Sequence, residues 1–156
     1  MKLNTCCFTG HRQLPRYKTE EIIVRLDFEI EKLINQGVTE FISGGALGFD
    51  QIAASLIVAK KELGANIRLA FALPCRNQDE KWTSDQRRLY HSLLSEADDV
   101  RYISEKFSAD CMRKRNFYMV DNARYCICAL LHETSGTAQT VRYAQRKGLK
   151  VINVAK

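Results

Sequence analysis

Three glycines stand where an apolar run gives way to a helical pattern, in the segment FISGGALGFDQIAASLIVA at residues 41–59. Glycine lets the backbone turn tightly and lets a ligand approach it closely. The helix that follows presents free N–H groups and the positive end of its dipole, which together attract an anion. Gly44, Gly45 and Gly48 therefore predict a phosphate-binding turn, the alternative being a turn that only joins a strand to a helix.

Two other junctions combine glycine with hydroxyl or basic side chains. The residues are Thr9, Gly10, His11 and Arg12 near the end of the first predicted strand, and Ser135, Gly136, Thr137 and Thr140 at the start of the last predicted helix. The carboxyl ends of parallel strands meet at one edge of a sheet, and ligands bind there. We therefore expect the three turns to form one site for an anionic ligand, with Arg12 binding its phosphate.

Several of these residues also have a purely structural explanation. Arg12 can be a surface arginine of a loop. His11 is expected to hydrogen-bond within its loop rather than act as an acid or base, because the sequence fixes no carboxylate partner for it. Asp50 is expected mainly to stabilise its helix as an N-cap or first-turn acid, by about 1 kcal/mol, a role compatible with binding a ribose hydroxyl. The hydroxyls that open the last helix are also ordinary caps.

Two further candidates lie away from the glycine turns. Trp82, in the polar segment PCRNQDEKW, is expected either to stack on a base as a lid or to pack the following helix onto the sheet. Arg115 and Asn116 share one helical face with Met112 and Met119. Burying an arginine and an asparagine requires polar partners, so we expect this pair to face the edge of the sheet that carries the glycine turns.

Apolar runs alternate with helical patterns along the whole chain. The predicted strands are Leu3–Phe8, Thr39–Ser43, Asn66–Leu73, Asp99–Ile103, Tyr125–Leu131 and Lys150–Val154. The predicted helices are Lys18–Gln36, Asp50–Leu63, Ser84–Glu96, Asp110–Asn122 and Thr137–Lys147. This alternation predicts an α/β fold: a single Rossmann-like, three-layer α/β/α domain with a mostly parallel six-stranded sheet in the order 4-3-2-1-5-6.

The amino-acid composition limits the class of protein and the kind of partner that we expect. The chain has 156 residues, 46% of them hydrophobic, which predicts one globular domain over residues 1–156. No apolar run reaches membrane-spanning length and no signal peptide is recognisable, so we expect a cytoplasmic protein with no membrane partner. The net charge of +6 favours an anionic partner and is compatible with nucleic acid, although aromatics do not interleave with a basic stripe. A homo-oligomer is also compatible with the sequence.

The six cysteines include no C-x-x-C pair. We therefore expect reduced, buried thiols and no metal site. A classical dinucleotide-binding dehydrogenase is disfavoured, because the first turn reads TGHR and contains no G-x-G-x-x-G motif.

The blocks CCFTGHR, FISGGALGFDQIAA, PCRNQDEKW, MRKRNFYMVDNA and SGTAQTVRYAQRKGLKVI resemble the SLOG superfamily, the Rossmann-like group that includes the Smf/DprA and LOG proteins. They most resemble its small bacterial YpsA-like branch and cover nearly the whole chain. The resemblance implies a nucleotide-type ligand bound at the glycine turns, and no other cofactor is assigned.

LOG proteins also hydrolyse cytokinin-type nucleoside monophosphates, and this chain departs from their motifs. Arg115 matches the LOG arginine, but Asn116 replaces the lysine of the pair, and Thr140 stands where the LOG glutamate is expected. Glu133 is the one acid near this turn, and it is more readily interpreted as a solvated loop residue. The sequence thus favours binding or sensing of a nucleotide-derived small molecule. The alternatives are a LOG-like N-glycosidase and, less favoured, a DprA-like binder of single-stranded nucleic acid.

Overall fold

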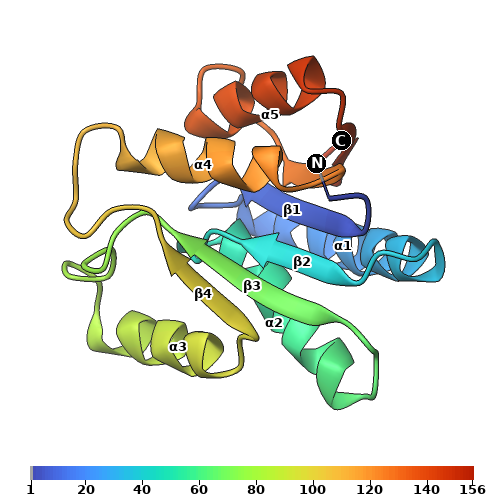
Figure 1. The fold of residues 1–156 in the computed structure, drawn as a ribbon, viewed down its shortest axis with the longest axis horizontal. Helices are drawn as coiled ribbons and strands as arrows, with labels where there is room; N and C mark the ends of the chain where they lie inside the picture. The colour runs from blue at the N-terminus through green and yellow to red at the C-terminus, as the bar shows by residue number, and fades with distance from the viewer. Residues whose placement is uncertain (1) are drawn as a thin grey trace.

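A six-stranded parallel sheet forms the middle layer of the computed structural model, which describes residues 2–156 (Figure 1). Its strands are β1 (Thr5–Gly10), β2 (Glu40–Ser43), β3 (Arg68–Leu73), β4 (Asp99–Tyr102), β5 (Tyr125–Ala129) and β6 (Lys150–Asn153). The helices are α1 (Arg16–Asn35), α2 (Phe49–Glu62), α3 (Ser84–Ser95), α4 (Cys111–Asp121) and α5 (Gly136–Arg146). The strand order β4-β3-β2-β1-β5-β6 confirms the predicted order, and every strand pair is parallel.

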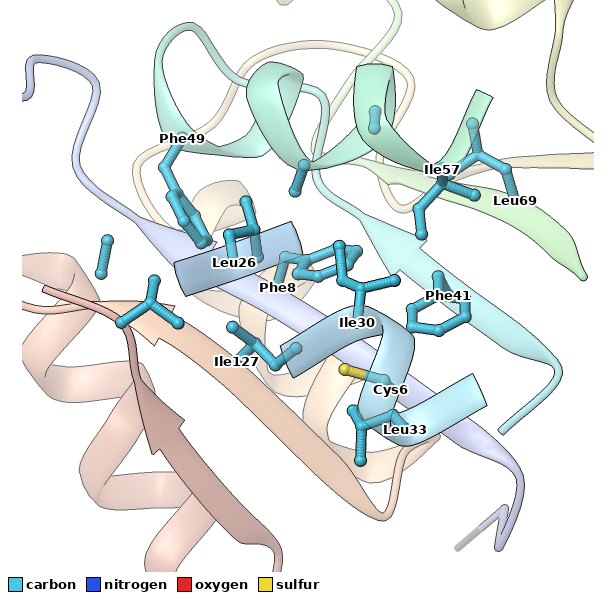
Figure 2. Packing of buried hydrophobic residues seen from close by; sticks show 14 of the residues in the cluster. Cys6, Phe8, Leu26, Ile30, Leu33, Phe41, Phe49, Ile57, Leu69 and Ile127 are labelled. Atoms are coloured by element: carbon cyan, nitrogen blue, oxygen red, sulfur yellow. The ribbon is translucent and has the colours of Figure 1, made fainter. Parts of the chain in front are cut away.

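The two faces of the sheet bury separate apolar clusters, because successive side chains of a strand point to opposite faces. Cys6 and Phe8 of β1 belong to the larger cluster, which α1, α2 and α3 cover. Cys7 belongs to the cluster beneath α4 and α5 on the other face (Figure 1). Figure 2 shows Phe8 between Phe41 and Phe49, with ring centroids 5.9 and 6.4 Å away. These contacts fix β1 at the centre of the domain.

Strands β1 and β5 are neighbours in the sheet, and the helices that follow them lie on opposite faces. Helix α1 leaves β1 on one face, and α5 leaves β5 on the other. The two connections diverge and open a crevice at the carboxyl ends of these strands, the place where ligands bind in such sheets.

Every predicted boundary lies within two residues of the observed one, and β1 is the one element displaced by two residues at both ends. The sequence predicted a strand over residues 3–8, whereas β1 extends through Thr9 and Gly10. These two residues pair with Cys128 and Ala129 of β5, and this long-range pairing carries the strand past the apolar run. The turn after β1 therefore begins at His11.

All six cysteines are free and buried, as the sequence predicted. No helix within residues 2–156 is both long and apolar enough to cross a membrane.

Candidate functional site

A pocket of about 250 Å³ lies at the end of β1, in the crevice between the connections that leave β1 and β5. Four chain segments supply its walls: the end of β1 with the loop after it, the turn after β2 with the start of α2, the first turns of α4 and the start of α5. The residues that line it are Thr9, Gly10, His11, Arg12, Ala46, Asp50, Met112, Arg115, Asn116, Ser135, Gly136 and Thr137. Ten of these twelve are predicted site residues, so the structure brings most of the candidates together at one edge of the sheet.

The side chain of Arg115 is the buried cation of this pocket, with 3% of the residue exposed. Its Nη1 donates to the carbonyl of Gly44 and, at 3.4 Å, to that of Ala72, while Nε donates to Asn116 Oδ1 at 2.8 Å. These bonds are the polar partners that burial of an arginine requires. Burial lowers the pKa of Arg115 and the negative charge of Asp50 counteracts this, but an arginine remains charged in a protein. The pocket therefore has a fixed positive charge in its wall.

Asp50 contributes a buried carboxyl group, with 5% of the residue exposed. Helix α2 has Gly48 as its N-cap, so Asp50 is a first-turn acid and not the cap. Its Oδ2 accepts from the Ala46 N–H at 3.3 Å, which ties the side chain to the turn before the helix. Burial raises the pKa of Asp50 to about 6, against the opposing effects of Arg115, the Ala46 N–H and Arg12. The group thus gains or loses a proton close to neutral pH.

His11 connects the turn after β1 to the end of β5. Its Nε2 accepts a hydrogen bond from the backbone N–H of Leu131 at 2.9 Å, which places the proton of the neutral ring on Nδ1. Burial and the nearby His132 ring, 4.8 Å away between centroids, lower the pKa of His11. His11 is therefore the hydrogen-bonding loop residue that the sequence predicted, and it lines the pocket as well.

The start of α5 faces the pocket with Ser135, Gly136 and Thr137. Ser135 is the N-cap: its Oγ accepts from the Ala138 N–H at 3.1 Å and donates to the His132 carbonyl at 2.7 Å. A Cβ built on Gly136 meets no atom within 4 Å, so the backbone is open to close approach. Thr140 behaves differently, because it is buried and donates to the carbonyl of Gly136 at 2.9 Å. The Thr140 hydroxyl is therefore satisfied within α5, and the residue does not line the pocket.

The glycines after β2 pack against the protein itself, and the structure does not bring them into this pocket. A Cβ on Gly44 would overlap the guanidinium of Arg115, and one on Gly48 would overlap the carbonyl of Arg12. Gly45 has a φ of +71°, and a Cβ there would lie 2.8 Å from the side chain of Leu73. None of these three glycines lines the pocket. Their effect on it is indirect, since they allow Arg115 and the backbone after β1 to come close.

Trp82 lies outside the first pocket, in the loop between β3 and α3. It is partly buried and packs edge-on against Tyr90 of α3, with 5.0 Å between ring centroids. It also lines a second hollow of about 520 Å³, which Arg12, Leu47 and Phe107 line as well. The packing role is therefore present in the structure, and the lid role stays a prediction. No sequence pattern marked Leu47 or Phe107, which come from loops.

Comparison of the chain with protein families gives a match to the YpsA model, described as the YspA SLOG family, over residues 7–151. The SPbeta prophage-derived protein YoqJ of Bacillus subtilis (strain 168) is 32% identical over 130 residues, which cover 75% of this chain and 76% of that protein. The UPF0398 protein BH1768 of Halalkalibacterium halodurans is 31% identical over 97 residues, or 61% of this chain and 51% of that protein.

Two solved structures of DNA processing protein A share the fold. The Helicobacter pylori protein, described for its single-stranded DNA binding mode, has a TM-score of 0.66 at 19% identity. The Streptococcus pneumoniae protein has a TM-score of 0.67 at 16% identity. The matches cover 94% and 96% of this chain but only 63% and 49% of those chains, and at these identities they show the fold alone.

Proposed function

Because the chain belongs to the YspA SLOG family, we propose that it binds a nucleotide or nucleotide-derived ligand with the phosphate in the pocket between β1, α4 and α5. The observation that carries this proposal is the buried guanidinium of Arg115, held by main-chain carbonyls in the wall of a pocket. The carbonyls supply only partial negative charge, and a bound anion would add a full opposite charge beside the buried guanidinium.

Two further groups favour an anion at the same place, and a third is compatible with it. Arg12 is exposed at the mouth and can close on a phosphate that Arg115 binds from within. The N-terminus of α5 contributes its dipole and unpaired N–H groups, and Gly136 leaves the backbone open. Asp50 does not oppose this role, because with a pKa of about 6 it can take up a proton as the anion binds. A protonated carboxyl group then donates a hydrogen bond to the anion.

A LOG-like hydrolase is the second candidate, and Asp50 is the observation that favours it. Thr140 is buried on α5 and bonded to the Gly136 carbonyl of the same helix, and Glu133 is exposed, with its Oε1 3.6 Å from Lys156 Nζ; neither residue lines the pocket. Asp50 is the one carboxyl group among the described residues that does. Its raised pKa is typical of groups that transfer protons. Release of free base from nucleoside monophosphates, abolished by Asp50→Asn, would favour hydrolysis over binding alone.

Titration calorimetry on the full chain tests the binding proposal. Ribose 5-phosphate, nucleoside monophosphates, the matching nucleosides and a short single-stranded oligonucleotide are the probes. We expect the phosphorylated probes to bind more tightly than the nucleosides, and Arg12→Ala to weaken them by about 1–3 kcal/mol. Arg16→Ala is the matched control, because Arg16 is also exposed but lines neither hollow.

Equal affinity for nucleoside and nucleotide, or equal effects of the two arginine substitutions, would contradict the phosphate site. Binding of the oligonucleotide together with failure of every mononucleotide to bind would favour a nucleic-acid function instead.

A further inference from the structure

The phosphate pocket is too small for a whole nucleotide, since sites for such ligands measure about 300–1,000 Å³ and this pocket about 250 Å³. Building on the proposed function, we propose that the second hollow, beside Arg12, is a base subsite that selects bases carrying an exocyclic amino group. The hollow measures about 520 Å³ and is lined by Arg12, Leu47, Asn77, Gln78, Glu80, Lys81, Trp82, Gln86 and Phe107.

Arg12 links the two spaces, because it lines both of them. A phosphate bound between Arg12 and Arg115 therefore places the rest of a nucleotide at the opening of the second hollow. Leu47 reaches the same hollow from the turn after β2, two residues after Gly45 and one before Gly48. The ribose would cross the Arg12 side chain, and the base would lie between the loops that follow β3 and β4.

Two aromatic side chains give this hollow the character of a base site. Trp82 is held edge-on against Tyr90, so its orientation is fixed before any ligand arrives. Phe107 is 66% exposed, an unusual position for a large apolar ring, and its backbone N–H donates to Asn77 Oδ1 at 3.2 Å. Every nucleobase has a flat π face, so any base can stack on such rings. The aromatics thus account for binding of a base, and polar groups must account for its identity.

The walls of the hollow are joined to each other by contacts between the two loops. The backbone N–H of Arg76 donates to the Glu105 carbonyl at 3.2 Å, and its Nε contacts Glu105 Oε2 at 2.7 Å. The Arg76 guanidinium also lies 4.2 Å from the centre of the Tyr102 ring. A hollow with connected walls loses less conformational entropy when a ligand binds.

Gln78 supplies the selective group. Its Nε2 donates to the Tyr90 hydroxyl at 3.1 Å, which leaves the amide oxygen, Oε1, for another donor. Within residues 2–156, this oxygen is the one buried side-chain polar atom that has no hydrogen-bond partner. A buried acceptor without a donor is unfavourable, and Gln78 lines the hollow, so an exocyclic amino group that reaches this oxygen relieves it. The amino groups of adenine and cytosine do so, whereas hypoxanthine and uracil present a carbonyl at the same position.

Matched nucleotide pairs test the subsite on the full chain. AMP is compared with IMP, CMP with UMP, and all four with ribose 5-phosphate, by titration calorimetry. We expect the amino-bearing member of each pair to bind about tenfold more tightly than its keto partner, the ratio typical of one unmatched buried polar group. Gln78→Met removes the unpartnered acceptor and should reduce this ratio to about one.

Phe107→Ala tests the stacking surface without disturbing a buried residue. It should weaken AMP about tenfold and leave ribose 5-phosphate unchanged. Phe28→Ala is the matched control, because Phe28 on α1 is 64% exposed and lines neither hollow.

The outcomes separate this inference from the proposed function. Tight binding of ribose 5-phosphate with no gain from any base overturns the base subsite and leaves the phosphate site standing. Equal affinity for AMP and IMP, or an AMP affinity unaffected by Phe107→Ala, also overturns the subsite as described. Failure of every phosphorylated probe to bind the unaltered protein overturns both proposals.

Discussion

The glycine turn after β2 and the glycine turn before α5 contain similar residues. The first leaves space for the protein's own groups, and the second leaves open space at the pocket. Gly44 leaves space for the guanidinium of Arg115, and Gly48 leaves space for the carbonyl of Arg12. Gly136, by contrast, faces open space at the pocket. A glycine in a turn therefore indicates that something approaches the backbone, and the packing decides whether that is the protein's own side chain or a ligand. Substitutions in the two turns should have opposite consequences for stability and binding.

Gly44→Ala is expected to have the largest effect, a loss of about 3 kcal/mol or more in the free energy of unfolding. The added methyl group would displace the Arg115 guanidinium from the carbonyls of Gly44 and Ala72 and leave a buried charge with fewer partners. Urea denaturation compared with the unaltered protein measures the loss. A Gly44→Ala protein of unchanged stability would show that Arg115 is not held as described.

Asp50→Asn tests the same turn through its charge. The folded-state pKa of about 6 lies above the ordinary value of 3.8, so the ionised carboxylate destabilises the fold at high pH. This cost is complete above about pH 6, falls as the pH drops through 6, and vanishes below about 4. The variant should therefore be more stable than the unaltered protein near pH 8, by roughly 1–3 kcal/mol, and the advantage should disappear towards pH 4.

Denaturation curves at several pH values measure this difference. The loss of attraction between Asp50 and Arg115 acts in the opposite direction, but burial is the larger effect on the Asp50 pKa. A stability difference that does not change between pH 4 and pH 8 would contradict the raised pKa.

The fold could be predicted from the sequence because its separate patterns all indicate the same architecture. Apolar runs and helical periods alternate, and short right-handed connections leave few strand orders to consider. The sequence placed the end of β1 two residues too early, since the pairing of Thr9 and Gly10 with β5 is a long-range contact that no local pattern records.

The convergence of the site was predictable for the same reason, because the ends of parallel strands meet at one edge. The contacts between individual residues of the site could not be predicted from the sequence. That Gly44 lies against Arg115, 71 positions away, follows from how α4 packs, and the contact of Asn77 with Phe107 follows from two irregular loops. Irregular loops carry no hydrophobic period, so their contacts appear only in the folded structure.

Ser135→Ala separates the two functions of the turn before α5. Loss of the N-cap hydrogen bond to the Ala138 N–H should reduce stability by about 1 kcal/mol. Thr83→Ala is the matched control, because Thr83 caps α3 in the same way but does not line the phosphate pocket. Both variants should lose similar stability in urea denaturation, and only Ser135→Ala should weaken ribose 5-phosphate. Similar affinities in the two variants would limit Ser135 to its structural role.

Gly136→Ala should have the smallest effect on stability and a clear effect on binding. Gly136 has no positive φ and a Cβ there meets nothing, so alanine fits at the start of α5 and stability should change by less than about 0.5 kcal/mol. The methyl group nevertheless enters the space through which a phosphate reaches the helix N-terminus, and ribose 5-phosphate should bind about tenfold more weakly. Gln139→Ala, on an exposed position of the same helix, is the control. Unchanged affinity in Gly136→Ala would move the phosphate away from α5 and leave the two arginines as its binding groups. A large loss of stability would show instead that this turn, like the one after β2, leaves room for the protein itself.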